Sequence, residues 1–543
     1  MTVVTEAVKK RPLNYPVLIS GAGPTGLLLA NLLGQAGIET LIIDKNKTES
    51  THPKAILLDD ESFRSLQNIG VAETVKQNCV MGYGARYYNE HQECFATIKS
   101  WQGEYAYPRR NSFLQPELEK ILVEKISDWP SVTFMRECEL TSFEQGSSQV
   151  LSSLKTQEGA LDVKSQFLLA CDGGRSFVRE SLGIALKGFD AECDWLVIDT
   201  ENDPDQDRFT KFICNYKRPA VSIPAPKGGR RYEFMVMKGD DSSQILKLKK
   251  IRELIKPFRK NLDQKDLTRS ALYRFHARIA ERFMEKNIFL LGDACHMTPP
   301  FAGQGMNAGL RDAQNLAWKI ARVVKGHSSQ KLLNSYSQER FKKVSDMIQF
   351  AVSLGDIVMP KTELDSKVMS TLWKLTNLIP EAREYVQKMK FKPKPHCTEG
   401  AFIFANKRND EDCHAGKMIP QPQVTLENQK QVLLDELLGN GFSLVALGLD
   451  AQEALEKISH QAFRQQEFKK VILLDKKENK ENISPGDLEL AYLDEDISKD
   501  KAYKILHPEG RIYLVRPDRY ILLDSTPKEI ENDFERISRT LSL

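Results

Sequence analysis

The chain has 543 residues, which predicts about three domains at roughly 100–200 residues per domain. Hydrophobic residues make up 41% and charged residues 28%, a globular composition rather than a disordered one. The 77 Lys and Arg nearly balance the 74 Asp and Glu, and a formal net charge of +3 argues against a nucleic-acid-binding protein.

The nine cysteines include no C-x-x-C pair and no Cys/His cluster at zinc spacing, which argues against both a disulfide framework and a metal site. The N-terminus has no apolar stretch of signal-peptide length. The most apolar early segment, Leu27–Ile43, is interrupted by Asn31, Gln35 and Glu39, and is therefore too polar for a membrane span. These features predict a cytoplasmic protein without stable membrane insertion.

The first predicted elements form one strand–helix–strand unit. Pro16–Ser20 is a short apolar run that predicts a buried strand, and a glycine-rich turn leads from it into an apolar helix. Gly37 is a stop signal for that helix, and Thr40–Ile43 predicts a second buried strand that ends at Asp44. A connection this short, with one helix between the strands, implies that the two strands are parallel.

The next strands are predicted much further along, at Phe167–Cys171 and Ile288–Leu291. Between them, from Asp194 to Phe275, short β-like runs alternate with turns, and one basic helix is predicted near Leu246–Lys260. We interpret this segment as a mixed sheet inserted into the first unit.

Two long helices are predicted after the insertion, at Asn307–Lys325 and Leu332–Met359, and Pro393 and Pro395 then mark a boundary. The tail returns to alternating elements. They are a strand at 443–448, a helix at 451–459, a strand at 471–475, a hairpin around Arg516–Asp518 and a final helix near 527–539. This order predicts a separate C-terminal α/β domain.

The turn Gly21–Gly26 (GAGPTG) has the pattern G-x-G-x-x-G. The first glycine permits a tight turn, the second lets the backbone approach a pyrophosphate, and the third lets the helix pack closely on the strand. The helix N-terminus then offers free N–H groups and the positive end of its dipole. Asp44 ends the second strand, where its carboxylate can accept hydrogen bonds from ribose hydroxyls; a plain turn aspartate is the alternative. Together these features predict a dinucleotide site.

Two further loops follow predicted strands. Asp172–Ser176 (DGGRS) comes after the strand at Phe167–Cys171 and is by itself a common strand ending. Gly292–Asn307 is a longer and more specific segment. Its Asp293 stands at a strand end, where a carboxylate can bind a polyol hydroxyl. Its glycine-rich part opens a helix whose N–H groups can stabilise developing negative charge. This loop predicts a ligand site.

In this order and spacing, the three motifs resemble those of the FAD-dependent aromatic hydroxylases, which are single-component flavoprotein monooxygenases. The resemblance covers about residues 15–360 and is greatest to the branch of 3-(3-hydroxyphenyl)propionate hydroxylase, phenol hydroxylase and polyketide hydroxylases. Members of this branch carry a C-terminal thioredoxin-like domain, and Ala415–Pro422 and Arg516–Asp518 are similar to its pattern. No cysteine follows Cys413, which excludes thioredoxin-type redox chemistry in the tail.

The resemblance implies an α/β fold. It consists of a Rossmann-like FAD-binding domain with an inserted mixed β-sheet substrate domain, followed by the thioredoxin-like α/β domain. The first part of the FAD-binding domain is expected at residues 1–193, with a short substrate-domain excursion at about 80–110. The substrate-binding sheet is expected at 194–275, and the second part of the FAD-binding domain, with its helices, at 276–394. The thioredoxin-like domain is expected at 395–543.

Carried over residue by residue, the resemblance implies cofactor contacts in three groups. The FAD pyrophosphate and adenosine ribose would be held by Gly21, Gly23, Pro24, Thr25, Gly26, Asp44 and Lys45. The flavin linker and the nicotinamide cofactor would be served by Gln115, Asp172, Gly173 and Arg175. The ribityl chain and the flavin would be lined by Gly292, Asp293, Pro300, Gly303, Gly305, Met306 and Asn307, with Asp293 binding either the ribityl chain or the neighbouring phosphate. Lys54 stands where the family usually has arginine.

The implied reaction is hydroxylation of a phenolic or polycyclic aromatic substrate with NADH or NADPH and O₂, through a flavin C4a-hydroperoxide. No second G-x-G-x-x-G is present, so we expect the nicotinamide cofactor to bind transiently. The expected partners are a small aromatic substrate and O₂, and a homodimer is left open.

The base that activates the phenol is not identified by the sequence. His296 lies beside the third motif, but we interpret it as a capping or packing residue. Tyr216, Tyr232 and Tyr273 lie in the inserted sheet and are interpreted as core residues. The charged run Lys247–Lys260 is interpreted as the solvated face of a helix.

Two alternatives to an aromatic hydroxylase remain at this point. The same scaffold can carry an epoxidase or another oxygenase; a halogenase would show a W-x-W-x-I-P segment, which the chain lacks. The other alternative is a non-catalytic flavin-containing interaction protein whose tail is the working part. The intact glycines and both aspartates argue against it.

Overall fold

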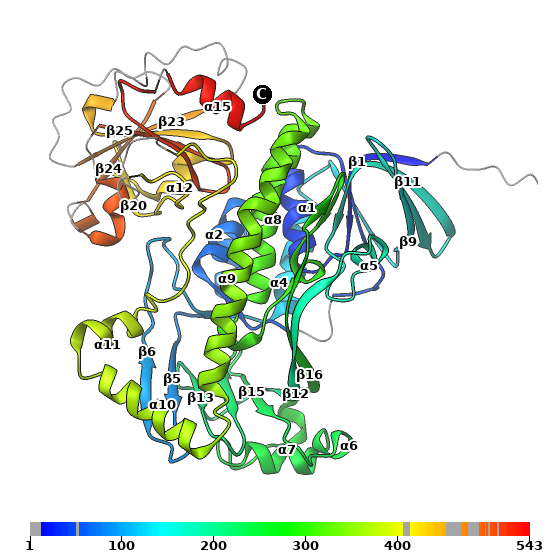
Figure 1. Ribbon diagram of the computed structural model, residues 1–543, viewed down its shortest axis with the longest axis vertical. Coiled ribbons are helices and arrows are strands. Elements are labelled where there is room, and N and C mark those ends of the chain that lie inside the picture. Colours follow the sequence, from blue (N-terminus) through cyan, green and yellow to red (C-terminus); the bar gives the residue numbers. More distant parts are fainter. Residues whose placement is uncertain are drawn as a thin grey trace, which may run out of the picture.

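The computed structural model describes residues 12–49, 54–404, 413–451, 455, 468–475, 488–494, 496–497, 500–507, 510–530 and 532–543. Three larger sheets and two long central helices organise these residues (Figure 1). In that view the first sheet lies beside the central helices, the second sheet lies below them, and the third lies at the upper left. None of the helices within the described ranges combines the length and apolarity needed to cross a bilayer.

The first sheet contains the predicted strand–helix–strand unit. β1 (Leu13–Ser20) pairs in parallel with β2 (Thr40–Asp44) and with β11 (Gly159–Ala170), so the predicted parallel arrangement is confirmed. The remaining strands are β8 (Val132–Arg136), β9 (Glu139–Gln145), β10 (Val150–Thr156), β17 (Met284–Glu285) and β18 (Ile288–Leu290). Because the inner strands are buried on both faces, their sequences are continuous apolar runs.

Helices cover this sheet and cross the middle of the molecule. α8 (Gly305–Val324) and α9 (Asn334–Val358) match the two long predicted helices, and α1 (Pro24–Gln35) packs against α8. A Cβ at Gly309 would lie only 2.3 Å from Thr25 Oγ1, so glycine allows α1 and α8 to approach closely. The shorter helices are α2 (Asp60–Asn68), α3 (Ala72–Gln77), α4 (Gln115–Ile126) and α5 (Phe177–Ser181).

The second sheet corresponds to the predicted insertion. Its order is β19-β16-β12-β15-β14-β13-β5-β6, and β5 and β6 come from the predicted excursion at about 80–110. The bounds are β5 (Gly84–Tyr88), β6 (Cys94–Ile98), β12 (Leu186–Thr200), β13 (Phe209–Ile213), β14 (Ala220–Pro224), β15 (Arg230–Met235), β16 (Leu267–Ala280) and β19 (His296–Met297). The long strands β12 and β16 thus extend past both ends of the 194–275 segment.

The two faces of the second sheet have different neighbours. On the outer face, Leu196 and Ile198 pack against α6 (Ser242–Ile245) and α7 (Leu248–Ile255). On the inner face, Trp195 and its neighbours pack against the 3₁₀ turn η3 (Pro300–Ala302) and α9. The inner face therefore lies against the loop of the third motif.

The third sheet lies in the tail, in the order β21-β20-β24-β23-β22-β25-β26. Its strands are β20 (Gln423–Leu426), β21 (Gln431–Leu433), β22 (Ser443–Leu447), β23 (Lys469–Asp475), β24 (Leu488–Leu493), β25 (Arg511–Val515) and β26 (Ile521–Ser525). β25 and β26 form the predicted hairpin, whereas the final helix, α15 (Phe534–Thr540), begins later than predicted. The predicted helix at 451–459 lies almost entirely outside the described residues.

A small sheet and two surface helices complete the elements used below. β3 (Leu57–Leu58), β4 (Val80–Met81) and β7 (Asn111–Ser112) form the small sheet, beside the third motif. α10 (Glu363–Thr376) and α11 (Pro380–Gln387) lie at the lower left in Figure 1, next to β5 and β6.

Buried ion pairs join the tail to the rest of the molecule. Arg516, with no exposed surface, donates to both carboxylate oxygens of Glu339 on α9, at 3.0 and 2.8 Å, and also pairs with Asp518. On the other side, Arg64 of α2 pairs with Asp435 at 2.6 Å. These contacts attach the third sheet to α9 and α2.

Candidate functional site

The N-terminus of α1 is open for an anion. Gly23 is the N-cap residue and offers no side chain, and Pro24 occupies the first turn without an N–H that needs a partner. Gly21 has φ of +103°, and a Cβ there would lie 2.3 Å from the carbonyl oxygen of Cys171. A Cβ at Gly26 would lie 2.0 Å from the carbonyl oxygen of Gly21. The turn therefore requires glycine at both positions.

Asp44 lies at the edge of this turn. Its Oδ2 accepts a hydrogen bond from the Ala22 N–H at 2.8 Å, and its Oδ1 accepts one from the Asn46 N–H at 2.8 Å. Oδ1 also accepts a hydrogen bond from Asn46 Nδ2 at 2.9 Å, so the half-buried carboxylate is fixed in position. Since a carboxylate oxygen can accept two hydrogen bonds, Oδ2 keeps capacity for a ligand. Lys45, which follows it, is exposed.

The second motif is linked to the third by a residue outside the predicted set. Asp172 Oδ2 accepts a hydrogen bond from the Val178 N–H at 3.2 Å, while its buried Oδ1 has no partner among the residues with a described position. Burial raises the pKa of this carboxyl. Gly173 follows with φ of +84°, and Arg175 is exposed. Arg179 is buried and donates to the carbonyl oxygens of Gly174 and Ala294, so it holds the two motifs together.

Asp293 has a carboxylate that the protein leaves largely unused. It lies in the turn η2 (Gly292–Ala294) directly after β18, and its side chain is 40% exposed. Its nearest charged neighbour is Lys54, whose Nζ is 3.9 Å from Oδ2. Both oxygens of Asp293 are therefore accessible to hydroxyl groups of a ligand.

Gln115 and Lys54 are brought to the same place. Gln115, at the start of α4, accepts hydrogen bonds at its Oε1 from the backbone N–H groups of Lys54 and Ala55, at 3.0 and 3.1 Å. Its Nε2 donates to Glu119. Gln115 thus holds the segment that carries Lys54 beside Asp293.

A buried triad missed by the sequence analysis supports the third motif. Asp312, on α8, accepts hydrogen bonds from the Gly292 N–H at 3.0 Å and from Arg340 Nε at 2.7 Å, and its Oδ2 lies 2.6 Å from His296 Nε2. Burial raises the pKa of Asp312, but His296 and Arg340 outweigh it and hold that pKa below its usual value. His296 has no exposed surface, which agrees with its interpretation as a packing residue.

The N-terminus of α8 is the second open helix end. Pro300 belongs to η3, and Gly303 follows it with φ of +62°. The first backbone hydrogen bond of α8 runs from the Ala308 N–H to the Gln304 carbonyl at 2.8 Å, and no side chain caps the helix. The N–H groups of the preceding residues, Gly305, Met306 and Asn307, therefore lie outside the helix ladder and can bind a negative charge.

The side chain of Asn307 is already engaged within the protein. Its Oδ1 accepts from Ser62 Oγ at 2.6 Å, and its Nδ2 donates to the carbonyl oxygens of Leu57 and Gly303. The predicted contact of Asn307 with the flavin can therefore involve its backbone N–H and not its side chain.

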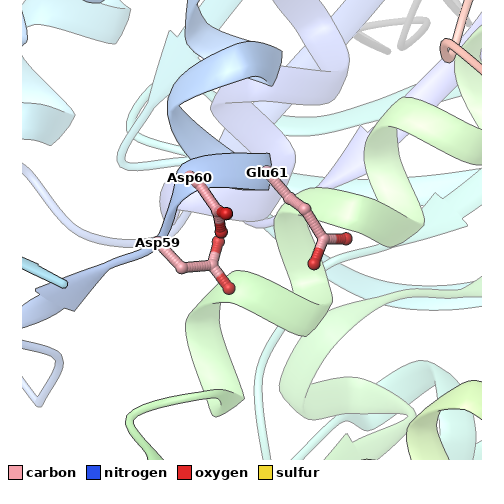
Figure 2. Close-up of side chains that lie close together, drawn as sticks. All are labelled: Asp59, Asp60 and Glu61. Atoms are coloured by element: carbon pink, nitrogen blue, oxygen red, sulfur yellow. The ribbon is translucent and has the colours of Figure 1, made fainter. Parts of the chain in front are cut away.

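A cluster of three acidic side chains lies close to this site. Asp59, Asp60 and Glu61 stand at the start of α2 and face α8 (Figure 2). Arg311 of α8 pairs with Asp59 and Glu61, and Lys392 reaches Asp59 at 3.0 Å. Burial raises the pKa of Asp60 to about 6, and repulsion by its two acidic neighbours adds to the shift. Because Arg311 and Lys392 offset its charge, the cluster serves to join α2, α8 and the segment that leads to the tail.

Comparisons with known proteins agree with this geometry. A family model described as FAD binding domain matches residues 14–351, and one described as HcaD C-terminal domain matches residues 416–540. The chain is 33% identical over 536 residues to the 3-(3-hydroxy-phenyl)propionate/3-hydroxycinnamic acid hydroxylase of Shigella sonnei (strain Ss046), an alignment that covers 97% of this chain and 95% of that protein.

Solved structures show the same fold at lower identity. The flavin-dependent monooxygenase PieE, in complex with FAD and substrate, has a TM-score of 0.79 at 18% identity, over 98% of this chain and all of that one. Aklavinone-11 hydroxylase, in a ternary complex with FAD and aklavinone, has a TM-score of 0.75 at 21% identity with the same coverage. Together with the identity along almost the whole chain, the FAD binding match shows that the chain belongs to the FAD-dependent aromatic hydroxylases, the flavoprotein monooxygenase family that its motifs resemble.

Proposed function

We propose that this protein hydroxylates a phenol that carries a short carboxylate side chain, with FAD, NADH or NADPH, and O₂. Membership of the family makes it an FAD-dependent aromatic hydroxylase. The narrower substrate class is supported by the 33% identity over 536 residues to a hydroxylase of 3-(3-hydroxyphenyl)propionate and 3-hydroxycinnamic acid. Both of these compounds combine a phenolic hydroxyl with a carboxylate on a three-carbon chain.

The open groups described above fit FAD. The uncapped N-terminus of α1, with its glycine turn, would bind the pyrophosphate, and Asp44 would bind the adenosine ribose. Asp293 would bind hydroxyls of the ribityl chain, and the N–H groups that begin α8 would face the pyrimidine edge of the flavin. Bound FAD supplies the redox chemistry, since it takes electrons from the nicotinamide cofactor and passes them to O₂.

The chain's own contribution is binding, orientation and exclusion of water. Phe301, two residues after Pro299, packs on Trp195 and Phe275 of the second sheet, with ring centroids 5.6 and 5.9 Å apart. This apolar surface would receive the aromatic ring and keep water from the reacting atoms. The α8 N-terminus would stabilise negative charge on the cofactor. The exposed position of Arg175 supports a transient contact with the nicotinamide cofactor.

The proposal includes the domain division expected from the sequence, with a thioredoxin-like domain from residue 395 to the end. In support, β23 and β22 are parallel, β25 is antiparallel to β22, and β26 follows β25 in a hairpin. The cysteines are free thiols, which supports a reducing compartment such as the cytoplasm.

We also propose that the protein forms a homodimer through α10 and α11. α10 buries Ser366 and Ser370 against the molecule and packs Trp373 inward, whereas its leucines and Val368 face solvent. Seven large apolar side chains are 48–77% exposed: Leu364, Val368, Leu372, Leu375, Leu378, Ile379 and Tyr385. Together they offer roughly 800 Å² of surface, the share that one partner contributes to a standard interface. A second copy, related by a two-fold axis, would cover the same stripe.

A substrate panel tests the reaction. The purified protein is expected to release free FAD on heat denaturation and to oxidise NADH or NADPH faster when 3-(3-hydroxyphenyl)propionate is present. The expected product contains one additional oxygen, and O₂ uptake should match NAD(P)H oxidation about one for one. A matched control is 3-phenylpropionate, which lacks the phenolic hydroxyl. If only alkenes, thiols or amines are oxygenated, the aromatic substrate class is wrong.

A further inference from the structure

An unpartnered carboxyl group lies on the inner face of the second sheet. Glu233, on β15, is only 7% exposed, and its cross-strand neighbours are Val197 on β12 and Val221 on β14. Among the described residues, its carboxylate takes part in no hydrogen bond and no ion pair. A buried carboxyl without partners is costly, so its retention on this face points to a ligand.

The charged groups around Glu233 are paired with one another rather than with it. Arg231, two residues earlier on β15, donates to Asp199 of β12 at 2.7 Å, and Arg269 of β16 donates to the same carboxylate at 2.9 Å. Tyr83, which precedes β5, is a further titratable group nearby: burial raises its pKa, and the charge of Glu233 adds to that shift. Burial raises the pKa of Glu233, although Arg231 and Arg269 partly oppose this shift.

A second unpartnered polar group lies on the same face. Trp195 has no exposed surface, and within the part of the chain that the structure describes its Nε1 has no hydrogen-bond partner. Trp195 pairs in register with Met235, and Val197 pairs with Glu233, so Trp195 and Glu233 are diagonal neighbours on adjacent strands. Such neighbours are about 7–8 Å apart at the backbone, within reach of one ligand atom held between two long side chains.

This part of the inner face adjoins the candidate cofactor site. Phe301, from the third motif, packs on the Trp195 ring at 5.6 Å. Arg231 donates a hydrogen bond to the carbonyl oxygen of Lys54 at 2.9 Å, and Lys54 in turn lies 3.9 Å from Asp293. A ligand between Glu233 and Trp195 would therefore lie against the same loops that would hold the flavin.

We propose that Glu233 is the catalytic base, which accepts the proton of the substrate's phenolic hydroxyl, while the Trp195 Nε1–H donates a hydrogen bond to the same oxygen. The phenolic O–H bond breaks, an O–H bond forms on the carboxylate, and the electron pair stays on the phenolate oxygen. The ring becomes more electron-rich and reacts faster with the electrophilic oxygen that the holoenzyme supplies. This assignment rests on the proposed function.

The chemistry of the pair favours a hydroxyl group over the substrate's carboxylate. A phenolic hydroxyl offers one donor and one acceptor, which match the acceptor Glu233 and the donor Trp195. A second carboxylate in this place would be repelled by Glu233. The substrate's carboxylate is therefore expected to lie away from this pair.

The test compares the Glu233→Gln holoenzyme with wild type and with a control, Glu201→Gln, an exposed glutamate of the same domain. First, the ultraviolet absorbance of 3-(3-hydroxyphenyl)propionate bound to oxidised enzyme is titrated with pH, because phenol and phenolate differ in absorbance. In Glu233→Gln the bound phenol should ionise at least one pH unit lower than in wild type, because the variant lacks the negative carboxylate that repels the phenolate, and the control should show no shift.

Product formation gives the second readout. Loss of a general base typically lowers a rate by 10²–10⁴-fold, so Glu233→Gln should form product at least tenfold more slowly and release more H₂O₂. Substrate-stimulated flavin reduction should stay within about twofold of wild type. Ring-fluorinated phenols, which are more acidic, should recover most of the lost rate. The Trp195→Phe variant should bind the phenol more weakly without weakening the binding of 3-phenylpropionate.

The outcomes separate the inference from the function on which it rests. A Glu233→Gln enzyme with wild-type phenol ionisation and wild-type coupling overturns the role of Glu233. The same holds if fluorinated phenols give no recovery. If Glu233→Gln does not fold, an unchanged affinity of Trp195→Phe for the phenol overturns the proposal that Glu233 and Trp195 bind the phenolic hydroxyl together. A wild-type enzyme that oxygenates no phenol overturns the proposed function itself.

Discussion

Replacing Asp293 by alanine should weaken FAD binding without weakening the folded protein. The Asp293 carboxylate is 40% exposed, and Lys54, with which it forms an ion pair among the described residues, is 3.9 Å away and itself 70% exposed. An exposed pair of this kind contributes about 0–1 kcal/mol to stability. A hydrogen bond from a cofactor hydroxyl to a carboxylate contributes about 1.5–3 kcal/mol. The variant should therefore bind FAD roughly 10- to 150-fold more weakly.

His296→Ala should instead weaken the folded protein more than it weakens FAD binding. The imidazole is fully buried, lies 2.6 Å from Asp312, and packs near Phe283 with ring centroids 6.1 Å apart. Its removal leaves a cavity and takes one partner from a buried carboxylate, which together cost about 3–5 kcal/mol. Because the His296 side chain is fully buried and bonded to Asp312, its removal should lower FAD affinity less than Asp293→Ala does.

Two measurements on deflavinated protein distinguish the variants. FAD dissociation constants are obtained from the quenching of flavin fluorescence, and stability from urea unfolding of the apoprotein. Asp293→Ala should raise the FAD dissociation constant and leave the stability of the apoprotein within about 1 kcal/mol of wild type. Equal FAD affinities in the two variants would refute the assignment of Asp293 to the cofactor, as would a large loss of apoprotein stability in Asp293→Ala.

Three further predictions concern catalysis, acid stability and assembly. A true phenolic substrate should raise NAD(P)H oxidation severalfold and lower the H₂O₂ fraction; a compound that raises oxidation but returns all of it as H₂O₂ is only an effector. Burial raises the pKa of Glu339, but Arg516 and Lys319 outweigh it and hold that pKa well below its usual value of about 4.3. The stability from Glu339 is therefore complete above about pH 5 and is lost as the pH falls below 4. Glu339→Gln should cost about 3–5 kcal/mol at pH 7 and about 1 kcal/mol less at pH 3.5, because the loss is progressive between the unfolded pKa and the lowered folded pKa; urea unfolding measures both values, and a penalty independent of pH would contradict this. Leu372→Lys with Leu375→Lys should convert a dimer to a monomer in sedimentation velocity, whereas a wild-type monomer that binds phospholipid vesicles would assign the stripe to a membrane surface.

The local pattern of the sequence was sufficient to predict the first sheet and the free N-termini of α1 and α8. Buried parallel strands are continuous apolar runs, and a tight turn against a neighbouring strand needs glycine, as at Gly21 and Gly26. These requirements act between residues close in the chain or in one pattern, so they can be recognised without the fold. The same holds for the hairpin of β25 and β26, whose turn residues lie together in the sequence.

Tertiary structure alone decided which polar side chains support the site and which remain available to a ligand. Asp312 carries no motif of its own, and Arg179 follows the second motif without a predicted role. Their roles depend on contacts with Gly292 and Ala294, which lie 20 and 115 residues away in the chain. Asn307 belongs to a recognised motif, but packing against α2 and β3 engages its side chain. Glu233 is one of many glutamates in the sequence. Its burial on the inner face follows from strand register, since a shift of one residue would turn the carboxyl toward the opposite face.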